Sequence, residues 1–299
     1  MKNDFAYLKR VRECFPRLDI VSVLMNQDGL VNDILIVNEE FVFRFPKNSG
    51  AARKILVNEY KVIKLAQQYV SMPLPEIEYV ADDVMVHRYI KGSALRLQDI
   101  LKLNKDECER VIEQLAVYLR ELHNVPMDEV TQSGIGQSDV NRNRDVWLKL
   151  LEDSKRELFP IMMPHTRESV IEHFAPIVAD ESFMNYEPKL INGDTVPYHI
   201  LFDKEARRIN GVIDFGTAGT GDAAADFACV IYNYGESFLR GMSRFYSEIE
   251  EAIDRARFWA GTLELQWALS GVRSQNNWWR TVHIGSAKDV QPIGSLWKD

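Results

Sequence analysis

Residues 190–221 read LINGDTVPYHILFDKEARRINGVIDFGTAGTG, and this stretch indicates the fold more strongly than any other part of the chain. It carries Asp194 in an expected loop and Asp214 in the sequence Gly-Val-Ile-Asp-Phe-Gly. The apolar runs 200–202 and 212–213 predict two strands that form a hairpin between the two carboxylates. Two acidic side chains separated by such a hairpin are typical of sites that transfer a phosphoryl group.

The residues of this stretch predict separate tasks in phosphoryl transfer. Asp194 would accept or orient the proton of the attacking hydroxyl, and Asp214 would hold Mg²⁺ across the phosphates. His199 lies where protein kinases have the asparagine of a second metal site, and Asn192 lies where they have a histidine. Mg²⁺ prefers oxygen to imidazole nitrogen, so the spacing alone leaves the metal role of His199 open. Either motif by itself could be an ordinary turn, whereas both in this order favour a catalytic segment.

The N-terminal third has the pattern of an antiparallel sheet. We expect a helix over 5–15, then strands over 20–24, 32–37 and 41–45, with a turn at Asn26–Gly29. Strand–turn–strand–turn–strand predicts a meander, and a nucleotide could lie beneath its first hairpin. The loop of that hairpin holds one glycine, so it is not a full glycine-rich loop.

A cation near the end of the third strand is expected to contact nucleotide phosphate. Kinase-type sites place a lysine on this strand and hold it with a glutamate from the next helix. Arg44 has the right strand position, whereas Lys47 has the right residue type but lies beyond the strand's end. The planar fork of arginine binds phosphate well, which favours Arg44. In the helix expected over 51–69, Glu59 is either the partner of that cation or a solvated helix charge.

A hinge is expected after two further strands, which the pattern predicts over 77–80 and 84–89. The sequence Ile-Lys-Gly-Ser that follows breaks the strand pattern. A purine base would meet the backbone of three residues there: Arg88, Tyr89 and Ile90.

The remaining two thirds are mainly helical in pattern. Asn104 is a candidate cap for the first helix, and Pro176 is expected to end the third. His123, at a helix end, is better explained as a structural hydrogen-bonding residue than as a base. Asp226 could either hold backbone N–H groups of the catalytic loop or complement a helix dipole. Helical spacing predicts helices over 104–123, 145–158, 166–175 and 223–234.

Acidic and tryptophan residues recur near the C-terminus. Carboxylates bind ammonium groups and indole rings pack on sugar faces, so these residues could form a surface for a polycationic sugar. For any single one of them, ordinary helix surface or core packing is the better explanation. The set is Glu236, Glu248, Glu250, Glu251, Asp254, Glu264, Trp267, Trp278 and Trp279.

Composition narrows the functional class. The 299 residues carry a net charge of −8 with a pI near 5.4, which argues against a nucleic-acid partner and suits a cationic small molecule. The three cysteines (Cys14, Cys108 and Cys229) form no C-x-x-C motif, as is typical of a reducing cytoplasm. No apolar run reaches the ~20 residues of a membrane span, and the N-terminus lacks a signal-peptide core. We therefore expect a cytoplasmic protein without membrane contact, and a monomer by default.

The motifs together resemble the aminoglycoside phosphotransferase family, and within it the 2″-type enzymes. Those enzymes and the related macrolide phosphotransferases also carry a histidine at the position of His199, so the resemblance implies that His199 binds metal. Asn192 in place of the usual histidine and Arg44 in place of the usual lysine depart from the family pattern, and the second departure is expected in the macrolide branch. The matching stretches are Phe41–Lys47, Asn58–Glu59, Leu119–His123, Asp194–Asp203, Gly211–Gly216 and Asp222–Phe227.

The resemblance implies an α+β, protein-kinase-like fold with a nucleotide-binding lobe over 1–90 and a catalytic and acceptor lobe over 91–299. It implies transfer from ATP or GTP, with Mg²⁺, to a hydroxyl of an aminoglycoside antibiotic. Asp194 would be the base, His199 and Asp214 the metal ligands. A macrolide phosphotransferase and a metabolic small-molecule kinase are the enzymatic alternatives. A catalytically inactive nucleotide-binding protein is the alternative from another class.

Overall fold

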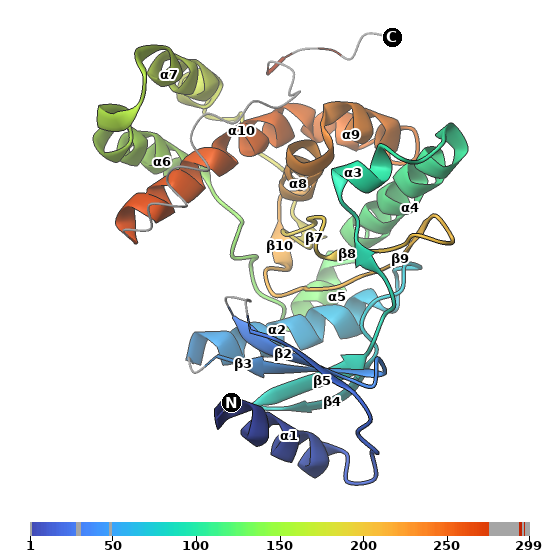
Figure 1. The fold of residues 1–299 in the computed structure, drawn as a ribbon. Coiled ribbons are helices and arrows are strands. Elements are labelled where there is room, and N and C mark those ends of the chain that lie inside the picture. Colours follow the sequence, from blue (N-terminus) through green and yellow to red (C-terminus); the bar gives the residue numbers. More distant parts are fainter. Residues whose placement is uncertain (1, 28–30, 48–49, 275–292, 295, 297–299) are drawn as a thin grey trace.

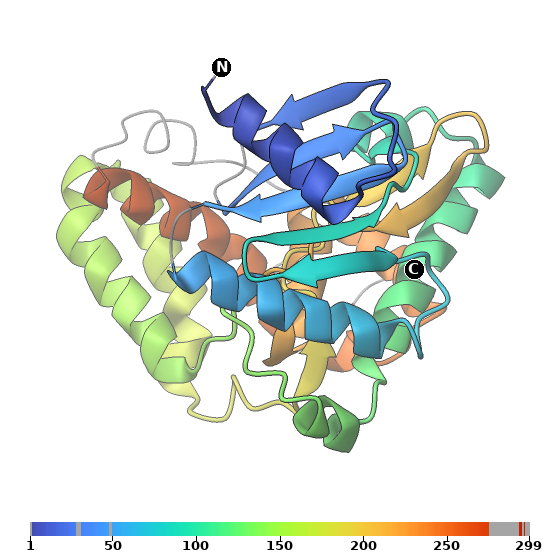
Figure 2. The same cartoon turned by 90° about the horizontal axis from the view of Figure 1, so that it is seen from below.

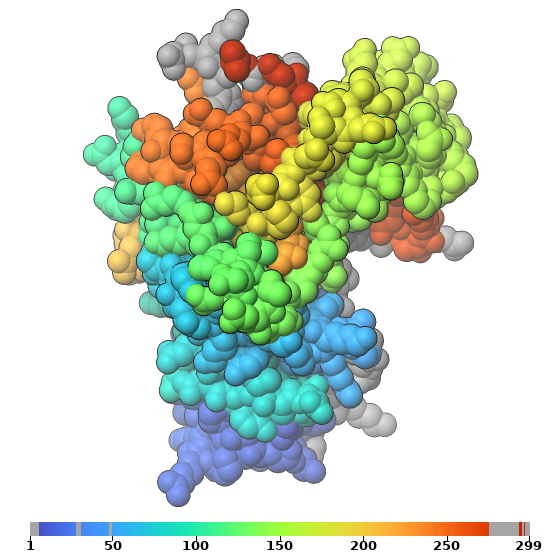
Figure 3. Space-filling view, turned by 180° about the vertical axis from the view of Figure 1, so that it is seen from behind, coloured from blue at the N-terminus to red at the C-terminus, as the bar shows by residue number. Residues whose placement is uncertain are grey.

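The fold is described from a computed structural model, which covers residues 2–27, 31–47, 50–274, 293–294 and 296. A small lobe built on an antiparallel sheet lies against a larger lobe of helices (Figure 1). Seen from behind, the blue N-terminal residues and the orange C-terminal helices lie at opposite ends of the molecule, with green residues between them (Figure 3).

The small lobe is a five-stranded antiparallel sheet in the order β1-β2-β3-β5-β4. Helix α1 (Lys2–Cys14) covers its outer face and α2 (Gly50–Ala66) lies on the side of the larger lobe (Figures 1 and 2). The strands are β1 (Val23–Asn26), β2 (Asn32–Val37), β3 (Phe41–Pro46), β4 (Ile77–Ala81) and β5 (Val84–Arg88).

The first strand differs from the prediction, because it begins at Val23 and includes Asn26, which was expected in a turn. The cause is Asn38, whose side-chain oxygen accepts hydrogen bonds from the N–H groups of Val21 (2.8 Å) and Ser22 (3.0 Å). These residues are thereby held in a loop, and pairing with β2 starts only after them.

The two faces of the sheet differ in character because side chains alternate along a strand. The outer face packs Leu35, Phe43 and Val86, all fully buried, against Val11 of α1. The opposite face carries six side chains that the strand register places together: Ile34, Ile36, Val42, Arg44, Met85 and His87.

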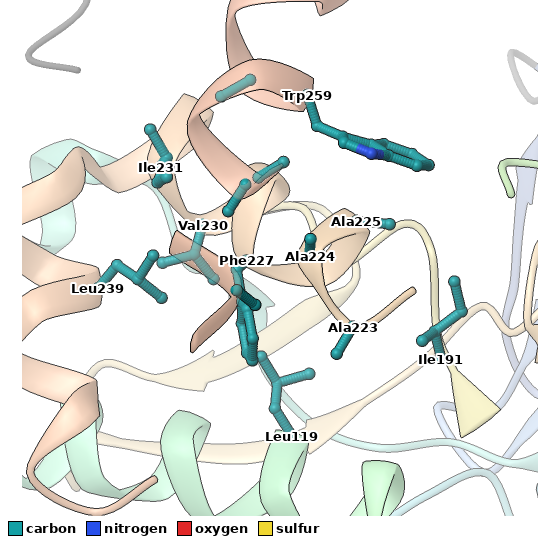
Figure 4. Packing of buried hydrophobic residues seen from close by; sticks show 14 of the residues in the cluster. Leu119, Ile191, Ala223, Ala224, Ala225, Phe227, Val230, Ile231, Leu239 and Trp259 are labelled. Carbon is teal, nitrogen blue, oxygen red and sulfur yellow. The ribbon is translucent and has the colours of Figure 1, made fainter. Parts of the chain in front are cut away.

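Helix α8 lies at the centre of the larger lobe, surrounded by α4, α9 and α10 (Figure 4). Its Phe227 is buried beside Leu119 of α4, and Trp259 of α10 lies on the side of Ala225. The helices are α3 (Leu97–Ile100), α4 (Lys105–His123), α5 (Met127–Gln132), α6 (Arg144–Glu157), a 3-10 turn (Phe159–Ile161), α7 (Pro164–Ala179), α8 (Ala224–Tyr234), α9 (Glu236–Ser243) and α10 (Ile249–Arg273).

Two helix predictions have clear outcomes. Asn104 caps α4 as expected, since its side chain accepts from the Glu107 N–H at 2.9 Å. The prediction that Pro176 ends α7 is wrong, because the helix continues to Ala179. Beyond the proline, the Asp180 N–H still donates to the Pro176 carbonyl (2.9 Å), and buried Ile177 anchors the last turn. Helices α3, α5, α9 and α10 were not predicted.

Two small sheets frame residues 190–221, which carry Asp194 and Asp214. Strand β7 (Lys189–Ile191) pairs with β10 (Gly219–Gly221), and β6 (Ser93–Ala94) pairs with β8 (Ile200–Asp203), which pairs with β9 (Arg208–Val212). The predicted hairpin is therefore present as β8–β9. None of the helices in the described residues is both long and apolar enough to cross a membrane.

Candidate active site

Asp194 lies in a loop that follows β7 and is held by a neighbouring amide. The Asn192 side-chain oxygen accepts a hydrogen bond from the Asp194 N–H at 2.9 Å, and its amide nitrogen donates to the Asp214 carbonyl at 3.3 Å. Asn192, fully buried, thus connects the two carboxylate-bearing loops from the position where kinases have a histidine. Between them, Gly193 has φ +76°, and a Cβ there would lie 2.7 Å from a methyl group of Val140.

Asp226 of α8 holds the backbone of the loop that carries Asp194. Its carboxylate accepts hydrogen bonds from the N–H groups of Asn192 (3.0 Å) and Gly193 (2.8 Å) and from the hydroxyl of Thr195 (2.9 Å). His123 adds a contact at 3.0 Å, and both the Asp226 and His123 side chains are fully buried. The loop-holding alternative for Asp226 and the structural explanation of His123 are both confirmed.

His199 lies between the two predicted catalytic carboxylates. Its Nδ1 is 2.9 Å from the Asp194 carbonyl oxygen, which can only accept, so Nδ1 carries the hydrogen. In the neutral ring this leaves a lone pair on Nε2, which lies 3.5 Å from Asp214 Oδ2. The imidazole nitrogen and the carboxylate therefore face each other across a gap that a shared cation could fill.

The pKa values of Asp194 and Asp214 are shifted in opposite directions. Burial raises the pKa of Asp194, the charges of Asp214 and Asp226 add to the rise, and His199 opposes it. Burial would also raise the pKa of Asp214, but Arg44, His199 and the Gly216 N–H together hold it below its usual value. Environments that shift the pKa values of two neighbouring carboxyl groups in opposite directions are typical of an acid–base residue beside a metal ligand.

Arg44 of β3 and Glu59 of α2 form a buried ion pair, which is the first of the two alternatives for Glu59. Glu59 also accepts from the Phe215 N–H at 3.0 Å, and an Arg44 nitrogen lies 3.6 Å from an Asp214 oxygen. Although burial lowers the pKa of Arg44, the charges of Glu59 and Asp214 outweigh it and raise the pKa. The pair therefore joins the sheet, α2 and the Asp214 loop in one network.

Lys47 does not reach this network. Its ammonium donates to the Gln27 carbonyl at 2.7 Å and lies 3.4 Å from Asp33. The structure thus brings Arg44, and not Lys47, beside Asp214.

At the expected hinge, most backbone donors already have partners. The Arg88 N–H donates to the Glu76 carbonyl (2.9 Å) and the Tyr89 N–H to the Glu40 carbonyl (2.8 Å). Within the described residues, the Ile90 N–H makes no hydrogen bond. The Arg88 side chain pairs with Glu40 and lies over the Phe41 ring, on the outer face of the sheet. A base at this hinge would therefore meet Ile90 and not the guanidinium of Arg88.

Sequence reasoning missed the other residues on the Arg44 face of the sheet. Ile34 and Ile36 are only half-buried, although Leu35 between them is fully buried, so this face offers apolar surface to a planar ring. His87 is 4% exposed on the same face, and burial lowers its pKa to about 4. Its Nδ1 lies 2.8 Å from the Arg88 carbonyl. Strand register, rather than any motif, is the signal that would have identified these residues.

Some of the acidic C-terminal residues are paired within the protein. Glu236 is buried in a bidentate pair with Arg257 (2.6 and 3.1 Å), and Asp254 binds the same arginine at 3.0 Å. Glu264 accepts from the Tyr232 hydroxyl at 2.5 Å. Structural roles thus account for Glu236 and Asp254, whereas Glu250 and Glu251 are exposed. Trp278 and Trp279 lie outside the described residues.

Magnesium is the cofactor that this chemistry implies. Within the described residues, no three His, Cys, Asp or Glu side chains gather to hold a metal by themselves. Mg²⁺ in phosphoryl-transfer sites is commonly bound by one or two carboxylates plus substrate phosphates and water. Half-exposed Asp214, with His199 Nε2 beside it, fits a Mg²⁺ that binds together with a nucleotide.

Comparisons with known proteins show the family to which the chain belongs. Residues 26–259 match the model of the phosphotransferase enzyme family. Viomycin phosphotransferase of Streptomyces vinaceus is 25% identical over 145 residues, which is 48% of each chain, so the chain spans about half the length of this relative.

Two solved structures have the same architecture. The GDP and kanamycin complex of the aminoglycoside phosphotransferase APH(2″)-IIIa gives a TM-score of 0.81 at 24% identity, covering 93% of this chain and 96% of that one. Macrolide 2′-phosphotransferase type I gives 0.73 at 17% identity, covering 96% and 99%. These likenesses confirm the α+β, protein-kinase-like fold, and the family model covers well over half of the chain, so the protein belongs to the phosphotransferase enzyme family.

Proposed function

We propose that the protein transfers the γ-phosphoryl group of ATP or GTP to a hydroxyl of an aminoglycoside antibiotic and so inactivates it. The observation that carries the proposal is the assembly around Asp214. His199 lies on one side of this carboxylate and the Arg44–Glu59 pair on the other, with Asp194 bonded to the same network.

The mechanism follows from these positions. The pKa of Asp194 is raised mainly by burial. This carboxylate takes the proton of the acceptor hydroxyl while the acceptor's oxygen forms its bond to the γ-phosphorus. The bond from that phosphorus to the β–γ bridging oxygen breaks, and the nucleoside diphosphate leaves. Arg44 lies where it can bind the phosphates, and Asp214 with His199 would hold Mg²⁺, which supplies neutralisation of phosphate charge when bound.

We assign nucleotide binding to residues 1–90 and the catalytic loop and acceptor site to residues 91–299. Ile34, Ile36 and Val42 would cover one face of the base, and Ile90 would meet its edge. Lys47 binds the Gln27 carbonyl of the first hairpin, so we assign the phosphate contact to Arg44. We propose a monomer that works in the cytoplasm, where its nucleotide donor is made.

Fewer observations support the class of the acceptor than support the phosphoryl-transfer reaction. The family match and the likeness to a fold that holds kanamycin support an aminoglycoside. A macrolide is the second candidate, and two observations favour it. Arg44 stands in place of lysine, and two of the carboxylates expected to bind ammonium groups, Glu236 and Asp254, bind Arg257 instead. An added phosphate carries about −1.5 to −2 charge, which would spoil the fit of either drug to an anionic RNA.

The test is nucleoside diphosphate release with ATP and with GTP against aminoglycosides, macrolides and viomycin. Wild type, D194A and D82A are compared, because Asp82 is an exposed carboxylate in the β4–β5 turn. Turnover that depends on an aminoglycoside, kept in D82A and lost in D194A, is the expected result. Turnover only with macrolides would move the acceptor to the second candidate. Nucleotide binding without turnover on any acceptor would overturn the enzymatic proposal.

A further inference from the structure

A second cavity, distinct from the site around Asp214, lies between α6 and the C-terminal half of α10. Figure 1 shows these helices side by side, away from β8 and β10, and the red end of α10 is seen beside yellow-green α6 in Figure 3. The cavity volume is about 610 Å³. Two helical stripes line it: Arg142, Val146, Lys149, Leu150 and Asp153 on the α6 side, and Gln266, Leu269, Ser270, Arg273 and Ser274 on the α10 side.

Arg142 is the unusual member of this lining. It is half-buried, and within the described residues its guanidinium makes no hydrogen bond or ion pair. Its one contact of note is the Trp147 ring, whose centroid is 5.8 Å from the guanidinium carbon. Burial lowers the pKa of Arg142, and no carboxylate opposes this effect. In a chain with a net charge of −8, an arginine withdrawn from water without an acid is a group that a ligand could satisfy.

The cavity lining gives no free carboxylate to Arg142. Asp153 is shared by three cations: Lys149 at 3.1 Å, Arg156 at 2.7 Å and Arg273 at 2.7 Å. The cavity lining therefore holds Arg142, Lys149 and Arg273 against the single acid Asp153, an excess of positive charge.

The rest of the lining combines an apolar floor with polar groups. Val146 is 40% exposed, and Leu269 beneath it is buried. On and just after α10, the residues Gln266, Ser270 and Ser274 recur every fourth position and so present amide and hydroxyl groups along one stripe. A guanidinium next to apolar side chains is an arrangement that binds a molecule with an anionic group and an apolar part.

We propose that this cavity binds an amphipathic organic anion, with Arg142 contacting the anionic group and the leucine and valine side chains contacting the apolar body. The proposal does not depend on the reaction at Asp194.

The test uses two fluorescent probes with nearly the same aromatic body. 8-Anilinonaphthalene-1-sulfonate carries an anion, and N-phenyl-1-naphthylamine does not. Each is titrated into wild type, R142M and the control K155M, since Lys155 of α6 carries the same charge but pairs with Glu152 outside the cavity. Thermal melting confirms that each variant is folded.

Loss of a hydrogen bond to a charged group costs about 1.5–3 kcal/mol, so R142M should bind the sulfonate about ten- to a hundredfold more weakly. K155M should bind it as wild type does, and the uncharged probe should bind all three proteins equally. D194A should also match wild type, which separates this site from the proposed reaction. Equal sulfonate affinity in wild type and R142M would overturn the proposal. So would an equal weakening of the uncharged probe, because the cavity would then have collapsed, and so would displacement of the sulfonate by ADP or GDP.

Discussion

Two buried arginine–glutamate pairs, one in each lobe, share their chemistry but differ in how completely they are satisfied. Arg257 of α10 binds both oxygens of Glu236 (2.6 and 3.1 Å) and also Asp254 (3.0 Å). Arg44 of β3 binds one oxygen of Glu59 and lies 3.6 Å from Asp214. Arg44 Nε and Glu59 Oε2 are buried without a hydrogen-bond partner, whereas no such atom occurs in the Arg257–Glu236 pair.

The comparison separates a pair that builds the fold from a pair that serves a site. An unsatisfied buried polar atom costs about 1–3 kcal/mol, so it is expected mainly where a ligand or a reaction uses it. The Arg257–Glu236 pair connects α9 to α10 and is complete without a ligand. The Arg44–Glu59 pair leaves one donor, Arg44 Nε–H, without a partner in the network that includes Asp214, where the proposed phosphates would bind.

The largest effect is expected from breaking the complete pair. R257M leaves the Glu236 carboxylate buried without its bidentate partner, which should lower the free energy of unfolding by about 3–5 kcal/mol. The double variant E236L/R257M removes both charges and should recover most of that loss. Urea denaturation followed by circular dichroism measures both. A double variant as unstable as R257M would show that the pair contributes packing rather than charge compensation.

Breaking the incomplete pair should act on catalysis. E59Q weakens the hold on Arg44 and on the Phe215 N–H, and misplaced phosphate contacts typically cost about 10²–10³-fold in rate. We expect kcat/KM for nucleoside diphosphate release to fall by that factor, measured well below the melting temperature. E236Q is the matched control and should change kcat/KM of the folded protein less than tenfold. Similar activity losses in the two variants would remove the distinction between the pairs.

The Arg44 side of the sheet should also be the acid-sensitive one. Burial lowers the pKa of His87 to about 4 from an ordinary 6.5, with Arg44 adding to the shift. Because the unfolded chain takes up this proton below about pH 6.5 and the folded chain does not, stability falls as the pH drops from 6.5 towards 4. Between pH 7.5 and pH 5 the loss amounts to about 2 kcal/mol.

H87Q should remove that part of the pH dependence, whatever its effect on stability at pH 7.5. H165Q, which replaces an exposed histidine, is the control and should keep the wild-type slope. Urea denaturation at four pH values from 7.5 to 4.5 gives the slopes. An unchanged slope in H87Q would mean that another group carries the proton.

The same two pairs illustrate what the sequence can predict. Arg44 and Glu59 could be assigned because a strand and the following helix fix their relative positions, and Asp194, His199 and Asp214 because one hairpin carries them all. Glu236 and Arg257 meet only where α9 packs on α10, which no local pattern specifies. His87 and Arg142 were missed for the same reason, since register and helix packing place them.

The smallest effect is expected from replacing Arg44 of the incomplete pair by lysine, which tests whether the site needs the arginine fork. Lysine binds phosphate as a point charge and needs no fork, so R44K should keep kcat/KM within about tenfold of wild type. R257K should instead lose stability by about 2 kcal/mol, because an ammonium cannot reproduce the bidentate contact with Glu236. Kinetics and urea denaturation on both variants give the four values. If R44K loses activity as severely as E59Q, the fork of Arg44 is itself required, and its unpaired Nε becomes the atom to assign to a phosphate oxygen.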